Sequence, residues 1–276
     1  MRALLKKGKH LTFVGAHDAF IAKLVENAGF DGVYLSGAGL SNSLGVTDTG
    51  VLHLDDFRYA GRYIAGAVSV PVLADADTGF DDVTQTVRAY IETGISGLHI
   101  EDQQFPKRCG HLDGKEVVDA SEMIAKVRLA AKTRNTLKED FLLIARTDAR
   151  GAVNIDEKDQ FAEAVRRGKA YIEAGADAIF PESLRSVEEF EKYRAEVPGP
   201  LLANMTDFGK TPFITTDEFE RLGYQIVIFP VSIFRYLAGC ASRAIEIIMK
   251  DGNQRNLVDG MMHRKEISRL LDYEIQ

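Results

Sequence analysis

The sequence predicts an α/β protein, a (β/α)8 barrel of the TIM type, in a single domain over residues 1–276. Short aliphatic or β-branched runs alternate with longer amphipathic segments along the whole chain. A chain of 276 residues suits such a barrel, and no Pro- or Ser-rich linker divides it. A doubly wound open sheet is the alternative with the same alternation.

Eight strands and eight helices are expected in strict alternation. The strands are predicted at 11–14, 32–35, 72–74, 97–100, 142–145, 178–180, 201–203 and 225–229. The helices are predicted at 18–27, 54–67, 83–92, 121–132, 160–173, 187–194, 216–222 and 232–250. Gly29, Gly94 and Gly175 recur where a helix gives way to a strand, which supports the repeat. The polar stretch 103–119 is expected to be a loop on the active-site face.

Charge and composition exclude several classes of function. The net charge of −7 argues against binding to a nucleic-acid backbone, although a few arginines in one pocket could still bind a small carboxylate. No apolar run approaches the roughly 20 residues that cross a bilayer, and the first residues lack a signal-peptide pattern. The sequence therefore predicts a cytoplasmic protein with no nucleic-acid or membrane partner.

Polar residues follow almost every predicted strand and are expected to converge on one pocket. They are Ser36, Asp75, Asp77, Glu101, Asp102, Arg146, Asp148, Glu182, Asn204 and Thr206. So many carboxylates repel one another unless a cation compensates, and hard oxygen ligands suit Mg²⁺ or Mn²⁺. Asp75 or Asp77 would bind the metal directly while Asp48, Glu101 and Glu182 hold its waters. The alternative is that single acids only cap helices, as Asp81 or Asp82 would before Val83.

Arg146 follows a buried aliphatic run, where an unpaired charge is costly. A substrate carboxylate, or a salt bridge to Glu101 or Glu182, would neutralise it. The segment Gly37-Ala38-Gly39 lacks the third glycine of a dinucleotide fingerprint, so we expect its backbone N–H groups to donate to a substrate carboxylate or oxyanion.

Cys109 is predicted to be a reactive thiol. Lys107 and Arg108 precede it, His111 follows, and Gly110 lets the backbone bring them together. This positive setting lowers a thiol pKa and prepares it for proton transfer or nucleophilic attack. A redox sensor is the alternative role. Cys240 lies among apolar residues and is predicted to serve packing.

Together these motifs resemble the isocitrate lyase and phosphoenolpyruvate mutase superfamily, and within it the methylisocitrate lyase branch. The resemblance rests on the segments 34–39, 75–80, 99–103, 107–111, 145–149, 180–182 and 204–209, which occur in the family's order. The cysteine loop favours the lyases over the phosphonate-forming mutases, which lack that cysteine.

The resemblance implies a magnesium-dependent carbon-carbon lyase acting on a 2-hydroxy acid. It assigns Asp75, Asp77, Asp48 and Glu101 to the metal site. It places Ser36, Gly37, Ala38 and Arg146 on the 2-oxo acid half of the substrate. The other half would be bound by Gly110, His111, Glu182, Asn204, Thr206, Arg235 and Arg264. Cys109 would protonate the carbanion, assisted by Arg108 and His111, and Tyr34 is the family's candidate base.

The favoured substrate is 2-methylisocitrate, which would give pyruvate and succinate, because the family's isocitrate lyases have bulkier side chains where this chain has Phe180 and Ile228. Isocitrate, 2,3-dimethylmalate and oxaloacetate are the alternatives, and an inactive carboxylate-binding relative is the alternative outside enzymes. The resemblance also implies a homotetramer that exchanges its last helix. The sequence departs from this pattern where it ends, at Gln276, so the resemblance does not fix the exchanged contact.

Overall fold

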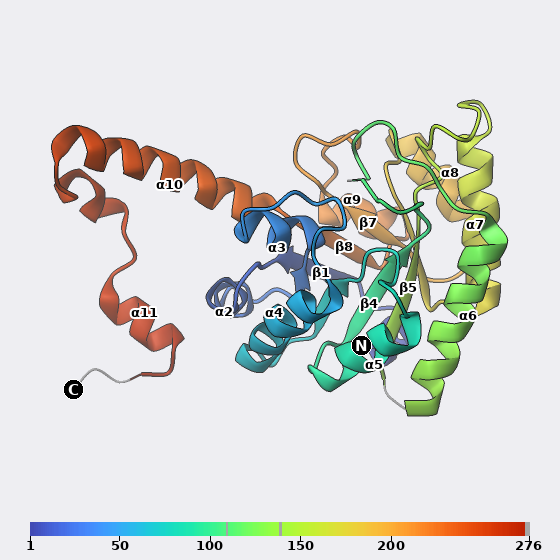
Figure 1. The fold of residues 1–276 in the computed structure, drawn as a ribbon, viewed down its shortest axis with the longest axis horizontal. Coiled ribbons are helices and arrows are strands. Elements are labelled where there is room, and N and C mark those ends of the chain that lie inside the picture. The colour runs from blue at the N-terminus through green and yellow to red at the C-terminus, as the bar shows by residue number, and fades with distance from the viewer. Residues whose placement is uncertain (109, 138–139, 274–276) are drawn as a thin grey trace.

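The computed structural model describes residues 1–108, 110–137 and 140–273, and it confirms the predicted barrel (Figure 1). The parallel strands follow the order β6-β5-β4-β3-β2-β1-β8-β7, and a single parallel bridge between Ile179 and Leu201 joins the two end strands. The strands are β1 (Leu11–Gly15), β2 (Gly32–Leu35), β3 (Val72–Asp75), β4 (Gly97–Glu101), β5 (Leu142–Thr147), β6 (Ala178–Pro181), β7 (Leu202–Asn204) and β8 (Ile226–Phe229).

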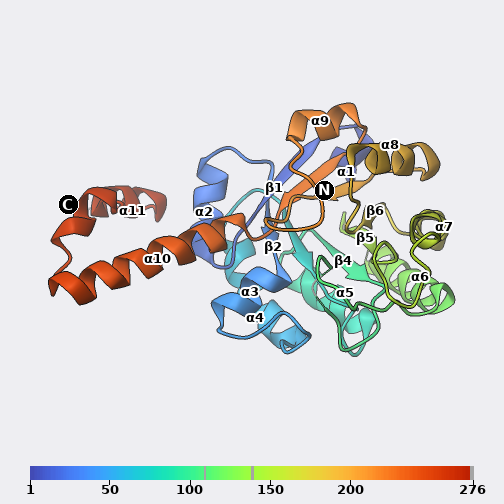
Figure 2. The same ribbon diagram turned by 90° about the horizontal axis from the view of Figure 1, so that it is seen from above.

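Helices alternate with these strands and surround the sheet (Figure 2). The predicted helices are α2 (Ala19–Asn27), α4 (Leu54–Ala67), α5 (Val83–Glu92), α6 (Ala120–Leu137), α7 (Gln160–Ala174), α8 (Val187–Glu196), α9 (Thr216–Arg221) and α10 (Ser232–Asp251). Asp82 caps α5 as expected, since its carboxylate accepts the Thr84 amide at 2.7 Å. Gly29, Gly94 and Gly175 all have a positive φ, which explains the glycine at each joint.

Four further elements were not predicted. They are α1 (Arg2–Lys6), α3 (Gly37–Ser43), the 3-10 helix η1 (Arg255–Gly260) and α11 (Arg264–Leu270). All are short, so they carry few turns of the apolar periodicity on which prediction depends. In α3, Ser36 caps a helix that begins at Gly37, because its hydroxyl accepts the Gly39 amide at 3.2 Å. The segment Gly37-Ala38-Gly39 is therefore the first turn of a helix.

Two apolar layers hold the barrel together. Inward side chains such as Phe13, Leu73, Ile144 and Ile228 fill its interior, and Leu5 of α1 packs with them from the amino-terminal end. A larger layer lies between the strands and the surrounding helices. Each strand is buried on both faces, as expected for a parallel sheet, and the carboxyl ends are left to carry polar side chains.

The last segment, residues 232–273, leaves the barrel and is called the arm below. Its α10 projects away from the sheet, and η1 and α11 turn back beside it (Figures 1 and 2). No residue of α10, η1 or α11 is buried. The arm returns to the barrel at α2, where Lys23 lies 3.5 Å from Asp272. In the described part of the chain, no helix is long and apolar enough to cross a membrane.

Candidate active site

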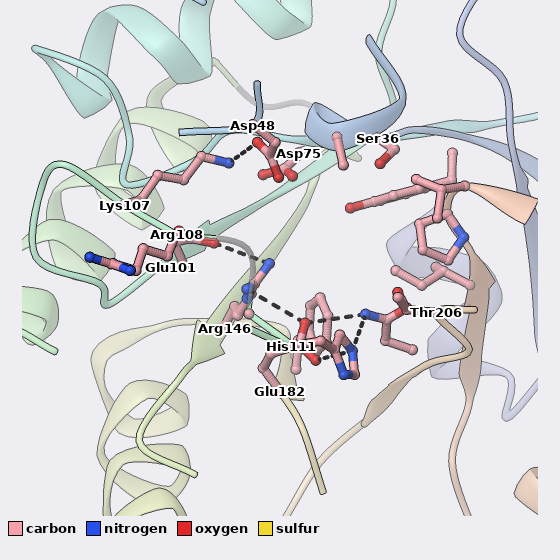
Figure 3. A pocket seen from close by; sticks show the side chains of 18 of the residues that line it. Ser36, Asp48, Asp75, Glu101, Lys107, Arg108, His111, Arg146, Glu182 and Thr206 are labelled. Carbon is pink, nitrogen blue, oxygen red and sulfur yellow. Dashed lines mark hydrogen bonds and ion pairs between the residues drawn. The ribbon is translucent and has the colours of Figure 1, made fainter. Parts of the chain in front are cut away.

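A pocket opens at the carboxyl ends of the strands, on the face where the sequence places its polar residues (Figure 3). It is lined by Tyr34, Ser36, Ala38, Asp48, Asp75, Glu101, Lys107, Arg108, Gly110, His111, Arg146, Phe180, Glu182, Asn204, Thr206, Ile228, Pro230, Val231 and Arg235. Most of the predicted site residues are thus brought together from every strand between β2 and β8. Cys109 lies outside the described residues.

Three of the residues that the resemblance assigns to the metal or substrate do not line this pocket. Gly37 lies behind it, with its amide donating to the Asp75 carboxylate at 3.3 Å. Asp77 lies on the far side of Lys107 and lines a neighbouring hollow. Arg264 begins α11 in the arm and is exposed, so within one chain it is remote from the site. The substrate-binding role of Arg264 and the backbone role of Gly37 remain predictions.

Lys107 joins the acidic residues on one side of the pocket. Its ammonium lies 2.5 Å from a carboxylate oxygen of Asp48 and 2.5 Å from one of Asp77, and the side chain is buried. Burial, together with the charges of Asp75 and Asp48, raises the pKa of Asp77 to about 7, although Lys107 opposes the shift. From the sequence, Lys107 was expected only to be a neighbour of Cys109. The excess of negative charge among the predicted acids could have indicated that Lys107 pairs with them.

The acidic residues fit a divalent cation. Glu101 is buried, and neither of its carboxylate oxygens has a hydrogen-bond donor among the described residues, although the Arg146 guanidinium lies 3.1 Å away. Burial raises the pKa of Glu101 well above its usual range. Buried carboxylate oxygens that lack donors, beside Asp75, form the hard donor set that Mg²⁺ or Mn²⁺ prefers. No three His, Cys, Asp or Glu side chains of the described ranges are already arranged around an ion position.

Arg146 connects the acids of neighbouring strands. Its Nε and Nη2 donate to the two oxygens of Asp148 at 2.8 and 3.0 Å. Its other contacts are with Glu101 at 3.1 Å and Glu182 at 3.5 Å, which are the two salt-bridge partners that the sequence predicted. The guanidinium also lies over the Phe180 ring, 5.1 Å from its centroid. Because Asp148 holds it from behind, Arg146 presents an oriented cation to the pocket (Figure 3).

The ring of His111 is fixed from both sides. Its Nδ1 accepts the backbone N–H of Lys210 at 3.0 Å, so this nitrogen carries no proton. The proton therefore lies on Nε2, which is 2.9 Å from Glu182. Burial would raise the pKa of Glu182, but His111 and Arg146 hold it well below its usual range. His111 thus donates from Nε2, and it ties the loop after β4 to the loop after β7.

Tyr34 has a partner that sequence reasoning missed. Its hydroxyl lies 2.6 Å from Nε2 of His99, inside the barrel, and Nδ1 of His99 lies 3.8 Å from Asp75. Burial raises the pKa of Tyr34 well above 10 and lowers the pKa of His99 to about 4. Both side chains are therefore neutral near pH 7. A phenolate at Tyr34 is costly here without a further cation near Asp75. In the sequence, a histidine in the middle of a buried strand, His99, was the feature that could have indicated this buried polar pair.

The opposite side of the pocket offers amide, hydroxyl and guanidinium donors. The Asn204 amide donates to Glu182 at 3.2 Å, and the Thr206 hydroxyl donates to Oδ1 of Asn204 at 2.9 Å. Arg235 is part-exposed at the rim, where it donates to the Asp207 backbone carbonyl and lies over the Phe208 ring. Arg108 is exposed, and its backbone is held by Gln103 through hydrogen bonds of 2.8 and 2.9 Å.

Two of the strand-end acids lie behind the pocket rather than in it, which corrects the expectation that the whole set converges there. Asp102 accepts from Arg167 at 2.9 Å and from Tyr171 at 2.7 Å, and it also accepts the Asp148 amide at 2.8 Å. Asp148 in turn supports Arg146. Both acids are fully buried, and they point away from the opening because cationic and hydroxyl donors of α7 and the loop after β4 lie there.

Comparisons with known proteins agree with this geometry. The family model for phosphoenolpyruvate phosphomutase matches residues 1–249. A 2-methylisocitrate lyase of Aeropyrum pernix is 42% identical over 276 residues, which cover 99% of this chain and 86% of the relative. The crystal structure of a 2,3-dimethylmalate lyase superposes with a TM-score of 0.90 at 34% identity, covering 98% of this chain and 90% of the other.

A phosphonopyruvate hydrolase solved with oxalate and Mg²⁺ is also similar, with a TM-score of 0.86 and 34% identity over 98% of this chain and 93% of that one. The likeness extends over nearly the whole chain in each case, so it includes the barrel and every element that contributes to the pocket. The chain therefore belongs to the phosphoenolpyruvate phosphomutase family, within the phosphoenolpyruvate mutase and isocitrate lyase superfamily that the sequence resembles.

Proposed function

We propose that this protein is a magnesium-dependent carbon-carbon lyase that cleaves 2-methylisocitrate to pyruvate and succinate. One observation carries the proposal: a single pocket holds buried carboxylates, an oriented Arg146 and a separate group of donors around His111. A substrate with two carboxylate-bearing halves needs these features together. The 2-methylisocitrate lyase of Aeropyrum pernix, 42% identical over nearly the whole chain, supports the choice of reaction.

The reaction is a retro-aldol cleavage. A base takes the proton of the substrate hydroxyl, the oxygen electrons form the carbonyl of the 2-oxo acid, and the broken carbon-carbon bond leaves its electron pair on the other half as a carbanion. Arg146 stabilises the forming carbonyl oxygen. When bound at the acidic residues, Mg²⁺ supplies further positive charge for that oxygen. Cys109 gives its proton to the carbanion, and His111 orients the carboxylate beside it.

The charge of Arg235 at the rim favours a tricarboxylate. Phe180 and Ile228 line the pocket, and the choice of 2-methylisocitrate over isocitrate depends on the space beside them. Arg235 at the rim can receive a third carboxylate, which smaller substrates such as 2,3-dimethylmalate and oxaloacetate lack. These remain the alternative substrates, since a structural relative acts as a 2,3-dimethylmalate lyase. A non-catalytic carboxylate-binding protein would not need the ordered Arg146 and His111.

A metal-dependent assay of the purified protein tests this proposal. Release of pyruvate or glyoxylate is measured with 2-methylisocitrate, isocitrate and 2,3-dimethylmalate, and release of pyruvate or oxalate with oxaloacetate, each with Mg²⁺ and with chelator. We expect the highest kcat/KM for 2-methylisocitrate and no turnover in chelator. Higher kcat/KM for one of the other acids would replace the substrate and keep the reaction class. No turnover of any of the four would refute the lyase proposal.

The arm supports a homotetramer in which the last helices are exchanged between subunits. The α10 helix leaves the barrel with Ile245, Ile248 and Met249 exposed. Beside its first turn, an apolar hollow is lined by Leu40, Leu44, Tyr59, Tyr63 and Phe234 among others. Apolar surface of this extent is typical of an interface between subunits. Light scattering of the full chain, expected to give four times 30.5 kDa, tests the assembly.

A further inference from the structure

The backbone of Gly110 lies directly against the ionic network of the pocket. A Cβ atom at Gly110 would lie 2.3 Å from Nη2 of Arg146 and 2.5 Å from Cγ of Glu182, so only glycine fits. Any displacement of Gly110 therefore changes its packing against Arg146. Because Gly110 has no side chain, other residues must hold its backbone in place.

Two buried donors hold the carbonyl oxygen of Gly110. The Lys115 ammonium donates to it at 2.9 Å, and the Ser183 hydroxyl donates to it at 2.7 Å. Ser183 has a φ of 63°, an unusual backbone conformation for a residue other than glycine. Two donors on one loop carbonyl, one of them a fully buried ammonium, are more than the solvation of a loop peptide requires.

Lys115 also reaches the group that orients Arg146. Its ammonium donates to Asp148 at 3.0 Å, and that same oxygen of Asp148 accepts from Arg146. Arg146 is shared among Asp148, Glu101 and Glu182, so Lys115 supplies a second positive charge at Asp148 in addition to its bond to the Gly110 carbonyl. Lys115 does not line the pocket and cannot touch a substrate there. Its contacts instead join the loop after β4 to the end of β5.

We infer that Lys115 is a positioning residue that, with Ser183, fixes the Gly110 carbonyl and so keeps the loop containing Cys109 and His111 aligned with Arg146. The alignment of loop and cation serves the lyase reaction proposed above, and the inference rests on that function for its catalytic part. Its structural part, the anchoring of the loop, stands on the contacts alone. The two parts can be measured separately.

Amide hydrogen exchange of the full-length protein, without substrate, tests the anchoring. In Lys115→Met we expect amides in peptides covering residues 103–119 to exchange at least about threefold faster, because a buried anchor has been removed. Peptides from α4 and α8 should exchange as in wild type. Lys169→Met, which removes an exposed partner of Glu196, is the matched control. Unchanged exchange of the loop in a folded Lys115→Met protein would overturn the inference.

Kinetics test the catalytic part. Lys115→Met should lower kcat about ten- to hundredfold, with KM changed less than about threefold, because the substrate-facing donors remain while their alignment is lost. If wild type turns over none of the substrates, the lyase proposal fails but the exchange measurement still decides the anchoring. A kcat equal to that of Lys169→Met would remove the positioning role.

A second variant covers the case in which Lys115→Met does not fold. Ser183→Ala removes the other donor to the same carbonyl without removing a buried charge. It should also speed exchange in residues 103–119 and lower kcat, by less than Lys115→Met. Ser183→Ala with wild-type exchange and wild-type kcat would contradict the role assigned to the Gly110 carbonyl.

Discussion

The mouth of the barrel and the arm use their side chains in opposite ways. At the mouth, Asp75, Glu101, Arg146 and Glu182 are ionisable yet buried, and each is at most 7% exposed. In the arm, Ile245 and Met249 are apolar yet 64% and 84% exposed. Buried charges are stable only among opposite charges and donors, which the mouth contains. Exposed apolar side chains have no such compensation within the arm. The contrast teaches that the buried charges of the mouth are compensated within one chain, whereas the apolar side chains of the arm are not covered within it.

The largest expected effect is at the mouth and tests whether its chemistry depends on Cys109. Cys109→Ser should lower kcat roughly 10²- to 10⁴-fold, because a hydroxyl is a far weaker acid than a thiol. The oligomer mass should not change. Steady-state assay and light scattering measure the two quantities, and Cys240→Ser is the matched control. Full activity in Cys109→Ser would remove the proton-donor role and leave the cation site unaffected.

The next prediction concerns the arm. The double variant Ile245→Glu and Ile248→Glu should dissociate the assembly, because charges would have to be buried in an apolar contact. The free energy of unfolding of a separated subunit should change by no more than about 0.5 kcal/mol, since both positions are exposed there. Sedimentation velocity and denaturant unfolding measure these effects, with exposed Glu246→Gln as control. An unchanged sedimentation coefficient would count against an arm-mediated interface.

Proton competition at the acidic residues gives a third, smaller effect. The pKa of Asp77 is raised to about 7, so below pH 7 its carboxyl group holds a proton that a cation must displace. The affinity for Mg²⁺ should therefore fall by up to about tenfold for each pH unit below 7 and level off above it. Calorimetric titration between pH 5.5 and 8.5 checks this. In Asp77→Asn the dependence should be weaker, and an equally steep dependence there would show that Asp77 does not control it.

The smallest expected effect distinguishes residues that stabilise the pocket from residues that act in catalysis. Tyr171→Phe removes one donor to the buried carboxylate of Asp102, whose other donors remain. It should lower the free energy of unfolding by about 1 to 3 kcal/mol and change kcat less than twofold. Thermal and denaturant unfolding measure the first quantity. Exposed Tyr59→Phe is the control, and a large fall in kcat with unchanged stability would move Tyr171 into the chemistry.

Regular features were predictable from the sequence, and contacts between distant segments were not. The strands and most of the predicted helices agree with the structure to within two residues, because each carries several turns or alternations of apolar pattern, whereas α6 extends to Leu137, five residues past its predicted end. The short α3 and α11 were missed because seven residues carry little pattern. The pocket residues were found because parallel strands place their carboxyl ends on one face.

What escaped prediction depends on where side chains point. Asp102 and Glu101 are adjacent in the sequence, yet one faces Arg167 and the other the pocket, because successive strand residues point to opposite sides. His99 and Lys107 were not assigned their partners, Tyr34 and Asp48, because these pairs are separated by 65 and 59 residues. Only the folded chain brings such partners together.

The single bridge between Ile179 and Leu201 makes one side of the barrel a weak seam. Above it, the amide of Asn204 reaches across from β7 to Glu182 after β6, so a side-chain contact of the pocket spans the same gap. A ligand that contacts both Asn204 and Glu182 would connect β6 and β7 at their carboxyl ends, where no backbone bridge joins them among the described residues. Occupancy of the pocket should thus strengthen the protein unevenly, slowing amide exchange most in β6 and β7.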